Sequence, residues 1–413
     1  MLSMLALTKV ENERQRNTLN LIASENYPSP AVLALLGSQW SNKYGEGYPG
    51  KRYYAGNQYT DILETQVQNL ALQVFDKTGE YGSNVQVLSG SNANMMVYLA
   101  MLEYGDTVMS VSIPNGGHLS HLSAVSNWNK FFKKVHYDVQ EIEPNTFEID
   151  EDDFVQKLTE HQPKLVIIGF SAYPRGYHFE KLIRLAHKHG ALVLADIAHI
   201  NGLVAAELHD TPFLAGDAGA DFVTMTTHKT MRGPRGALLF FKKTYEQIIN
   251  KTIFPGTSGG PHFHQIAATG RALEEILGVE TYPGDVSFVD YSKAVIVNTK
   301  SLENGLAAAG IEIISPTQTH LCLIKLPDTI DSLEMQKMLE CQGVITNRNT
   351  IPFDPKSAWR PSGLRLGMAA LTSRGISTEQ SFELGTRIGV AIIKGDDMSL
   401  YAHELAANLK WYY

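Results

Sequence analysis

The feature that most constrains the fold is an alternation, between residues 85 and 241, of short apolar runs with segments of helical pattern. The apolar runs are predicted to be buried strands, at residues 85–88, 107–111, 165–170, 191–195, 222–225 and 237–241. Helical patterns stand between them, at residues 95–102 and 179–189. Strands that alternate with helices favour a mostly parallel sheet with helices on both faces. The sequence therefore predicts an α/β fold.

The pattern changes after the Gly- and Pro-rich residues 254–261. Beyond them we predict helices near residues 264–277, 286–309 and 332–340 and from residue 378 onward, and strands at 311–315, 321–326 and 344–347, which indicates a smaller α+β domain. Before the sheet, helices are predicted at residues 9–22, at 31–40 and around Leu63, Val67, Leu70 and Val74. We therefore expect an N-terminal arm (1–30), a large domain (31–270) and a small C-terminal domain (271–413).

Composition narrows the class of protein. With 413 residues, 44% of them hydrophobic, the chain can bury a sizeable core. Its 35 Lys and Arg against 43 Asp and Glu give a net charge of −8, which argues against nucleic acid as a partner. Cys322 and Cys341 are in no CxxC pair, which fits a reducing compartment. The apolar residues 1–8 lack the positive charge of a signal peptide and are too short to span a bilayer, so we expect a cytoplasmic protein without membrane contact.

Polar side chains gather where the predicted strands end. Ser171, Asp196, His199 and Lys229 all follow strands, and the Ser89-Gly90-Ser91 turn precedes a helix at the same edge. In sheets of this kind, ligands bind outside the carboxyl ends of the strands. Free N–H groups at a helix N-terminus also suit a phosphate, although ordinary helix capping explains a Ser-Gly-Ser sequence equally well.

Lys229 is the candidate nucleophile. It lies between two apolar runs and is followed by Arg232 and Arg235. Partial removal from water and nearby cations disfavour the ammonium form, and the free amine can form a Schiff base with a carbonyl. A surface lysine in a basic turn is the alternative interpretation.

An acid at the end of a strand and a candidate phosphate site join Lys229 at the same edge of the sheet. Asp196 ends a wholly apolar strand, where an unpaired carboxylate is unfavourable, so it needs a cation or a ligand nitrogen. An acid for a pyridine nitrogen, a lysine for an aldehyde and a helix N-terminus for a phosphate together suit pyridoxal phosphate. His118 could stack on its ring. No pair of histidines or carboxylates has a convincing ligand spacing, so we expect no metal.

A loop rich in glycine and tyrosine, residues 44–56, has the composition of a ligand-facing loop, and a packed surface loop is the alternative. With this loop, a series of motifs resembles the serine hydroxymethyltransferase family along nearly the whole chain. The motifs are LIASEN (21–26), EGYPGKRYY (46–54), SGS (89–91), GGHL (116–119), SAY (171–173), DIAH (196–199), THKT (227–230), RGPRG (232–236), FPG (254–256) and SGLR (362–365).

The resemblance implies a fold-type I pyridoxal phosphate enzyme that interconverts serine and glycine with tetrahydrofolate. It implies a homodimer with shared active sites and leaves pairing into tetramers open. The implied catalytic residues are Lys229, Glu46, Tyr54, His118, Asp196 and Arg235. The implied cofactor-binding residues are Ser89, Gly90, Ser91, His118, Ser171, Asp196, His199, His228 and Lys229, with Gly259 and Gly260 from the neighbouring subunit. The implied substrate residues are Ser24, Tyr44, Glu46, Tyr54 and Arg365, and the implied folate residues are Gly117, Leu119 and Asn349.

Within these roles, Asp196 would pair with the pyridine nitrogen, and Ser171 and His199 would bond around the phenolic oxygen. Arg365 would bind the substrate carboxylate, a task that suits a guanidinium. Glu46 and Tyr54 would come from the partner subunit.

The chain departs from the family's usual pattern at Asn115, where a histidine is usual, at residues 127–132, at Phe353, where an asparagine is usual, and at residues 359–361. These departures motivate an alternative: a specialised relative that performs aldol-type chemistry on another amino acid or aldehyde, of threonine aldolase or α-methylserine type, without folate. A non-catalytic scaffold on the same fold is a third hypothesis, against which Lys229, Asp196 and Arg365 stand.

Overall fold

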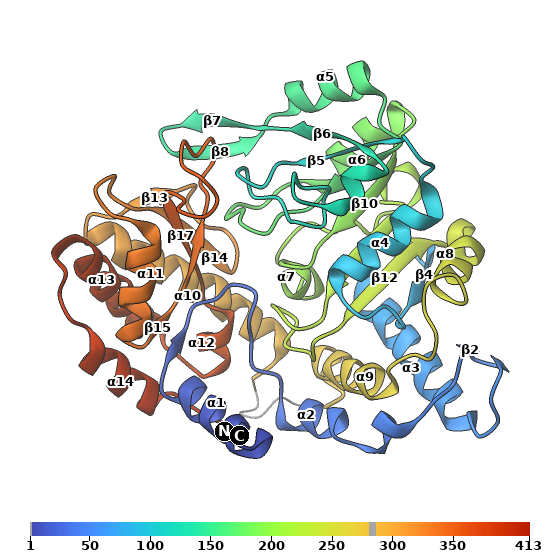
Figure 1. Cartoon of the computed structure of the whole chain (residues 1–413), viewed down its shortest axis with the longest axis horizontal. Coiled ribbons are helices and arrows are strands. Elements are labelled where there is room, and N and C mark those ends of the chain that lie inside the picture. The colour runs from blue at the N-terminus through green and yellow to red at the C-terminus, as the bar shows by residue number, and fades with distance from the viewer. Residues whose placement is uncertain (1, 281–285) are drawn as a thin grey trace.

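The computed structural model describes residues 2–280 and 286–413, and within them a seven-stranded sheet forms the centre of the larger unit (Figure 1). Its strands, in spatial order, are β4 (Tyr81–Asn84), β12 (Ala237–Lys242), β11 (Phe222–Thr226), β10 (Leu192–Asp196), β9 (Leu165–Ile168), β5 (Thr107–Val111) and β6 (Lys133–Tyr137). All neighbours pair in parallel except β12, which is antiparallel to both β11 and β4. The predicted mostly parallel sheet is confirmed. Strand β12 runs the other way because the chain returns from β11 without a crossover helix.

Helices cover both faces of this sheet. They are α3 (Gln58–Phe75), α4 (Gly90–Met101), α5 (Glu151–His161), α6 (Phe179–Lys188), α7 (Asn201–Ala205), α8 (Glu246–Ile253) and α9 (Phe263–Leu277). Alternate residues of β10 face opposite ways, as the strand period of two requires. Val193 and Ala195 share a core with α3, α5, α6 and α9, whereas Leu194 shares another with α4 and α8. Burial on both faces explains why these strands are continuous apolar runs.

One predicted strand is wrong. Residues 85–88 form no strand, and the paired segment is β4, immediately before them. The Asn84 side chain accepts a hydrogen bond from the amide of Gln86 at 2.9 Å, so that amide is not available to the ladder with β12. Val85 and Val87 are nevertheless buried, which accounts for the apolar run. The extended segment carries the chain from β4 to the start of α4.

The smaller unit contains an antiparallel sheet of strands β13 (Glu312–Ile314), β14 (Leu321–Lys325), β17 (Gly363–Gly367) and β16 (Asn347–Asn349). Its helices are α10 (Phe288–Ala308), α11 (Ser332–Cys341), α12 (Ala369–Ser373), α13 (Thr378–Lys394) and α14 (Ser399–Asn408). Helices α10 and α13 pack very closely where Gly305 of α10 meets α13. A Cβ on Gly305 would lie only 2.1 Å from the carbonyl oxygen of Phe382, so the approach requires glycine. The predicted α+β pattern is present here, although the predicted strand 344–347 is divided between β15 (Val344–Ile345) and β16.

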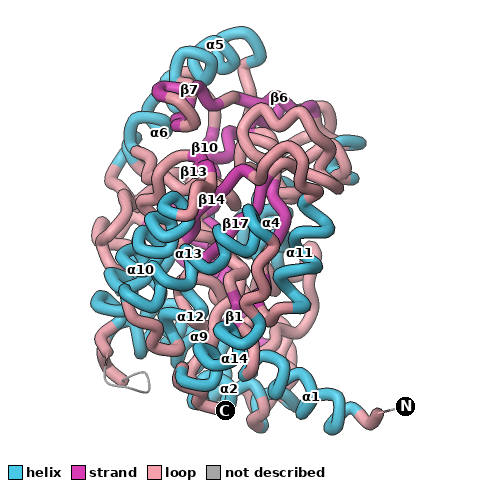
Figure 2. The backbone as a smooth tube through the Cα atoms, turned by 90° about the vertical axis from the view of Figure 1, so that its left-hand side faces the viewer, coloured by secondary structure: helices cyan, strands magenta, loops and turns pink. Residues whose placement is uncertain are grey.

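The N-terminal segment joins the two units. The helix predicted at residues 9–22 is α1 (Met4–Arg16), which begins earlier because Ser3 caps it and ends earlier because residues 19–20 pair as a strand. Helix α1 has no buried residue and extends from the body (Figure 2). Strand β1 (Leu19–Asn20) pairs with β15, and Leu19 and Leu21 lie in the core of the smaller unit. Helix α2 (Pro30–Leu36) then packs on α9 of the larger unit. The two chain ends overlap in Figure 1 but lie well apart in Figure 2, although the Trp411 indole near the C-terminus donates to Asn12 Oδ1 of α1 at 3.0 Å.

Two hairpins extend from the larger unit: β2 (Gly47–Tyr48) pairs with β3 (Lys51–Arg52), and β7 (Val139–Glu143) pairs with β8 (Thr146–Ile149).

The predicted domain boundary near residue 270 falls inside α9, whose Leu273 still packs in the larger unit's core. Within the described residues, no helix combines the length and the apolar character needed to span a bilayer.

Candidate active site

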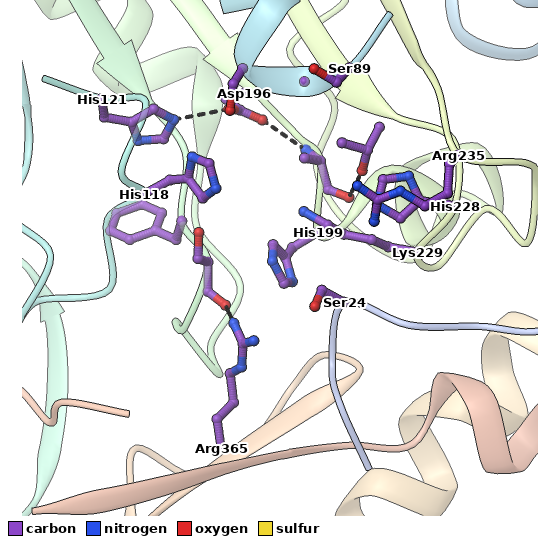
Figure 3. Close-up of a pocket in the computed structure, with 16 residues that line it drawn as sticks. Ser24, Ser89, His118, His121, Asp196, His199, His228, Lys229, Arg235 and Arg365 are labelled. Atoms are coloured by element: carbon purple, nitrogen blue, oxygen red, sulfur yellow. Dashed lines mark hydrogen bonds and ion pairs between the residues drawn. The ribbon is translucent and has the colours of Figure 1, made fainter. Parts of the chain in front are cut away.

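A cavity of about 340 Å³ opens where the carboxyl ends of the central strands face the smaller unit (Figure 3). It is lined by many residues predicted from the sequence: Ser24, Ser89, Gly90, Ser91, His118, Ser171, Asp196, His199, His228, Lys229, Arg235 and Arg365. His121, Phe170, Ala198 and Thr226 also line it and were not predicted. Asp196 ends β10 and Lys229 follows β11, whereas Arg365 comes from β17 of the other sheet. The cavity is therefore built by both units.

The carboxylate of Asp196 is buried and held by three donors. Asn94 Nδ2 donates to Asp196 Oδ2 at 2.8 Å, His121 Nε2 lies 2.9 Å from the same oxygen, and the Ala198 amide donates to Oδ1 at 3.1 Å. Burial acts to raise the pKa of Asp196, but the hydrogen bond and charge of His121, supported by Asn94, outweigh it and hold that pKa below its usual value. The group is therefore an ionised carboxylate that faces the cavity.

Lys229 is held from its main chain and is 7% exposed. Its carbonyl oxygen accepts a hydrogen bond of 2.7 Å from Asn26 Nδ2, whose amide also donates to the Tyr291 hydroxyl at 2.8 Å. Burial lowers the pKa of Lys229 to about 8; Asp196 opposes this shift, whereas the charges of Arg365 and Arg235 reinforce it. The environment thus makes the neutral, nucleophilic amine accessible near neutral pH.

The N-terminus of α4 faces the cavity opposite the smaller unit. Ser89 caps this helix, and the first amides of a helix have no intrahelical acceptors. A Cβ on Gly90 would lie 2.8 Å from Thr226 Cγ2, so only glycine fits there. His228 lies beside Arg235, with Nε2 and Nη1 3.4 Å apart, and burial lowers the pKa of His228 to about 3. These donors form a site suited to a phosphate.

Arg365 lies at the other end of the cavity. Its Nη1 donates to the carbonyl oxygen of Ser171 at 2.6 Å, and its Nε donates to Asn347 Oδ1 at 3.1 Å. A guanidinium has five N–H donors, so these two bonds leave capacity for a carboxylate ligand. Nearby, His199 Nδ1 lies 3.2 Å from His320 Nε2, and burial lowers the pKa of both rings, so the pair is neutral.

Eight predicted residues do not line the cavity, and they fall into two sets. Tyr44, Glu46, Tyr54, Gly259 and Gly260 do not line the cavity but form a separate group, here called the tyrosine group. The Tyr44 hydroxyl donates to Glu46 Oε1 at 2.8 Å, and the rings of Tyr44 and Tyr54 meet edge to face at 5.1 Å. A Cβ on Gly260 would lie 2.7 Å from the Tyr44 ring, and one on Gly259 would lie 3.2 Å from Glu46 Oε1. The structure thus brings these five residues together, on the surface of the chain.

The residues matched to the folate pocket are Gly117 and Leu119, on the loop after β5, and Asn349, at the end of β16. Gly117 is confined, since a Cβ there would lie 2.5 Å from the Val111 carbonyl oxygen, and Leu119 is exposed two residues further on. Asn349 ends β16, and its side-chain amide donates to the Thr350 carbonyl oxygen at 2.8 Å.

Two of the departures from the family's pattern contact each other. Asn115 Oδ1 accepts the amide of Phe353 at 3.3 Å, and Asn115 Nδ2 donates to Asp138 at 2.8 Å. Phe353 has a left-handed backbone, with φ of 53°, and its ring packs against Phe147. Another departure, residues 127–132, lies away from the cavity, because Trp128 and Phe132 pack on Tyr98 of α4.

Besides Phe170, Ala198 and Thr226, sequence reasoning missed three polar side chains that contact site residues: His121, Asn94 and His320. His121 stands three positions after His118 in the same loop, and this spacing is the one sequence signal that pointed to it. Asn94 lies in the first turns of α4, behind the phosphate site, where a buried amide gave no distinct sequence signal. His320 immediately precedes β14 in the smaller unit, and it contacts His199 only in the folded chain.

The residues present fit pyridoxal phosphate. An ionised carboxylate, a buried lysine of lowered pKa and a helix N-terminus face one cavity, and the buried His228 Nδ1 has no hydrogen-bond partner within the described part of the chain. Together with the sheet, this arrangement defines a fold-type I pyridoxal phosphate-dependent enzyme. A sequence model of the family described as serine hydroxymethyltransferase matches residues 2–388 of the 413. The chain belongs to the serine hydroxymethyltransferase family and is a transferase of that cofactor class.

Proposed function

We propose that this enzyme transfers the hydroxymethyl carbon of serine to tetrahydrofolate, reversibly, and releases glycine. The observation that carries the proposal is the convergence of Lys229, Asp196, the α4 N-terminus and Arg365 on one cavity. Bound pyridoxal phosphate supplies an aldehyde for the amine and a protonated ring that accepts electrons from the substrate Cα. The protein must then hold the cofactor, orient the amino acid and move protons.

Residues at different positions in the cavity are proposed to serve different parts of the reaction. Ser89, Gly90, Ser91 and His228 hold the phosphate, and Asp196 keeps the proton on the ring nitrogen because its carboxylate remains ionised. His118 would cover one face of the bound ring, and Ser171 and His199 would bond around its phenolic oxygen. Arg365, with Ser24 beside it, binds the substrate carboxylate, and Arg235 organises the phosphate end with His228.

We further propose a homodimer in which the tyrosine group of one subunit completes the cavity of the other. Tyr44 and Tyr54 are 52% and 47% exposed in the single chain, although they are large aromatic residues. In the dimer, Glu46 and Tyr54 would serve proton transfer and substrate positioning, and Gly259 and Gly260 would approach the phosphate. We place the enzyme in the cytoplasm, since Cys322 and Cys341 are free thiols.

Tetrahydrofolate is the proposed co-substrate, and Gly117, Leu119 and Asn349 are proposed to line its site. The contact between Asn115 and Phe353 favours the second candidate, a relative that acts on another β-hydroxy amino acid without folate. This contact ties the loop before His118 to the loop after Asn349, and both loops border the proposed folate site.

The test compares turnover of serine, threonine and α-methylserine by the pyridoxal phosphate-loaded enzyme, with and without tetrahydrofolate. We expect serine turnover that depends on folate, and a new visible absorption band with glycine only when folate is present. Faster, folate-independent cleavage of threonine or turnover of α-methylserine would establish the second candidate. A matched variant, Phe353→Asn, should leave serine turnover intact if the first candidate is correct.

A further inference from the structure

Ser120 lies between His118 and His121 and makes four polar contacts. Its hydroxyl oxygen is 2.7 Å from His118 Nδ1, and its backbone amide is 3.1 Å from the same nitrogen. The same hydroxyl oxygen accepts a hydrogen bond of 3.0 Å from Asn94 Nδ2. The Tyr98 hydroxyl donates to the Ser120 carbonyl oxygen at 2.8 Å. Ser120 is therefore fixed from both its side chain and its main chain.

The direction of these bonds follows from the groups that can only donate or only accept. The backbone amide of Ser120 can only donate, so His118 Nδ1 must present its lone pair. Asn94 is oriented by the carboxylate of Asp196, which accepts from its Nδ2, and by Thr224, whose hydroxyl donates to its Oδ1 at 2.6 Å. Asn94 therefore donates to Ser120, and the Ser120 hydroxyl proton is left for His118 Nδ1. Two donors from one residue meet the same ring nitrogen.

We propose that Ser120 is a positioning residue that holds His118 as the neutral tautomer with its proton on Nε2, and that Asn94 couples this arrangement to Asp196. The inference rests on the proposed function for the position of His118 over the cofactor ring. A neutral imidazole can lie against a protonated pyridine ring without charge repulsion. Protonation of Nδ1 would remove both hydrogen bonds from Ser120.

The charges around His118 agree with this assignment. His121 faces it from the same loop, Asp196 from β10, His199 from the following loop, Lys229 from the loop after β11 and Arg365 from β17. Burial lowers the pKa of His118 to about 4; the charges of His121, Lys229 and Arg365 reinforce this shift, and Asp196 opposes it. Loss of the Ser120 hydroxyl removes a donor that favours the neutral ring, so the pKa of His118 should rise.

The experiment is ¹⁵N NMR of the full chain labelled at histidine, with and without pyridoxal phosphate, over a range of pH. The His118 signals are identified by their loss in His118→Gln. In the unaltered protein, Nδ1 should stay unprotonated and Nε2 protonated. In Ser120→Ala, the pKa of His118 should rise by about one unit, and the acid side of the turnover profile should move in the same direction.

Two variants separate positioning from packing. Ser120→Thr keeps the hydroxyl and should restore the native tautomer and profile. Ser123→Ala removes another buried hydroxyl from the same loop, one without a hydrogen-bond partner among the described residues, and should change neither. A proton on Nδ1 in the unaltered protein would overturn the proposal, even if Ser120→Ala failed to fold. Unchanged His118 signals in folded Ser120→Ala would also overturn it. Because the NMR signals require no turnover, the result is independent of whether serine is the substrate.

Discussion

The cavity and the tyrosine group belong to the same chain, but they differ in how far their side chains are buried and how fully these are hydrogen-bonded. In the cavity, Asp196 and Lys229 are 8% and 7% exposed, and the Asp196 carboxylate receives hydrogen bonds from three donors. In the tyrosine group, Tyr44 and Tyr54 are about half exposed, and Glu46 is held by Tyr44. The first region is preorganised within one chain, whereas the second has exposed aromatic surface that a neighbouring molecule can cover.

This difference separates two kinds of information about an active site. A preorganised pocket identifies the cofactor, because carboxylate, amine and helix N-terminus must all face one volume. The exposed aromatic rings of the tyrosine group motivate the proposal that this group acts in a neighbouring subunit. The following predictions test whether the two regions belong to one site.

The largest effect is expected for Lys229→Ala. Loss of the amine should lower turnover by at least about 10³-fold, because no other lysine lines the cavity in the described residues. The measurement is turnover of the cofactor-loaded variant, with Lys337→Ala, an exposed lysine on α11, as the control. Near-normal turnover in Lys229→Ala would contradict the assigned role.

Arg365→Ala should mainly weaken binding of the amino acid. Loss of a charge-assisted pair with the substrate carboxylate should raise KM by about 10²-fold, with a smaller change in kcat. Arg365→Lys keeps the charge but loses the planar donor geometry and should be intermediate. Steady-state kinetics with serine measures both constants. An unchanged KM in Arg365→Ala would place the carboxylate elsewhere.

Mixed dimers test the connection between the two regions directly. If the tyrosine group acts in the neighbour's cavity, Lys229→Ala and Glu46→Ala subunits, each inactive alone, should recover roughly a quarter of normal activity when mixed equally. Half of the dimers are then mixed, and each has one intact site. As a control, Lys229→Ala mixed with Asp196→Ala should recover nothing, because both residues belong to the same subunit's cavity. Absence of recovery in the first mixture would refute the shared site.

The smallest effect concerns pH. The pKa of Lys229 is lowered to about 8, so the neutral amine is the minor form below that pH and the major form above it. The rate at which the cofactor-free protein captures pyridoxal phosphate should therefore rise through about 8 and then level. In Arg235→Gln, loss of a positive charge should move the midpoint upward. A rate that keeps rising toward the usual lysine pKa of 10.5 would show that the amine is not desolvated.

Much of the fold followed from apolar pattern. Strands β5, β9, β10, β11 and β12 lie where the runs predicted them, because a strand buried on both faces must be apolar throughout. The same rule failed at residues 85–88, where burial without pairing gives the same apolar run. The start of α1 was also misplaced, since exposed apolar residues before Lys9 gave no helical periodicity.

The sequence alone determined which chemistry is present and at which edge of the sheet it lies. Ser171, Asp196 and Lys229 had to meet because they lie at or just beyond the carboxyl ends of β9, β10 and β11, which are neighbours and run in the same direction. Tertiary structure alone decided how these groups are held. Asn94 meets Asp196 across 102 positions of sequence, Asn26 meets Lys229 across 203, and Arg365 meets Ser171 across 194. Hydrogen bonds depend on distance and direction within a few tenths of an ångström, and only the packing of whole helices and strands fixes side chains that closely.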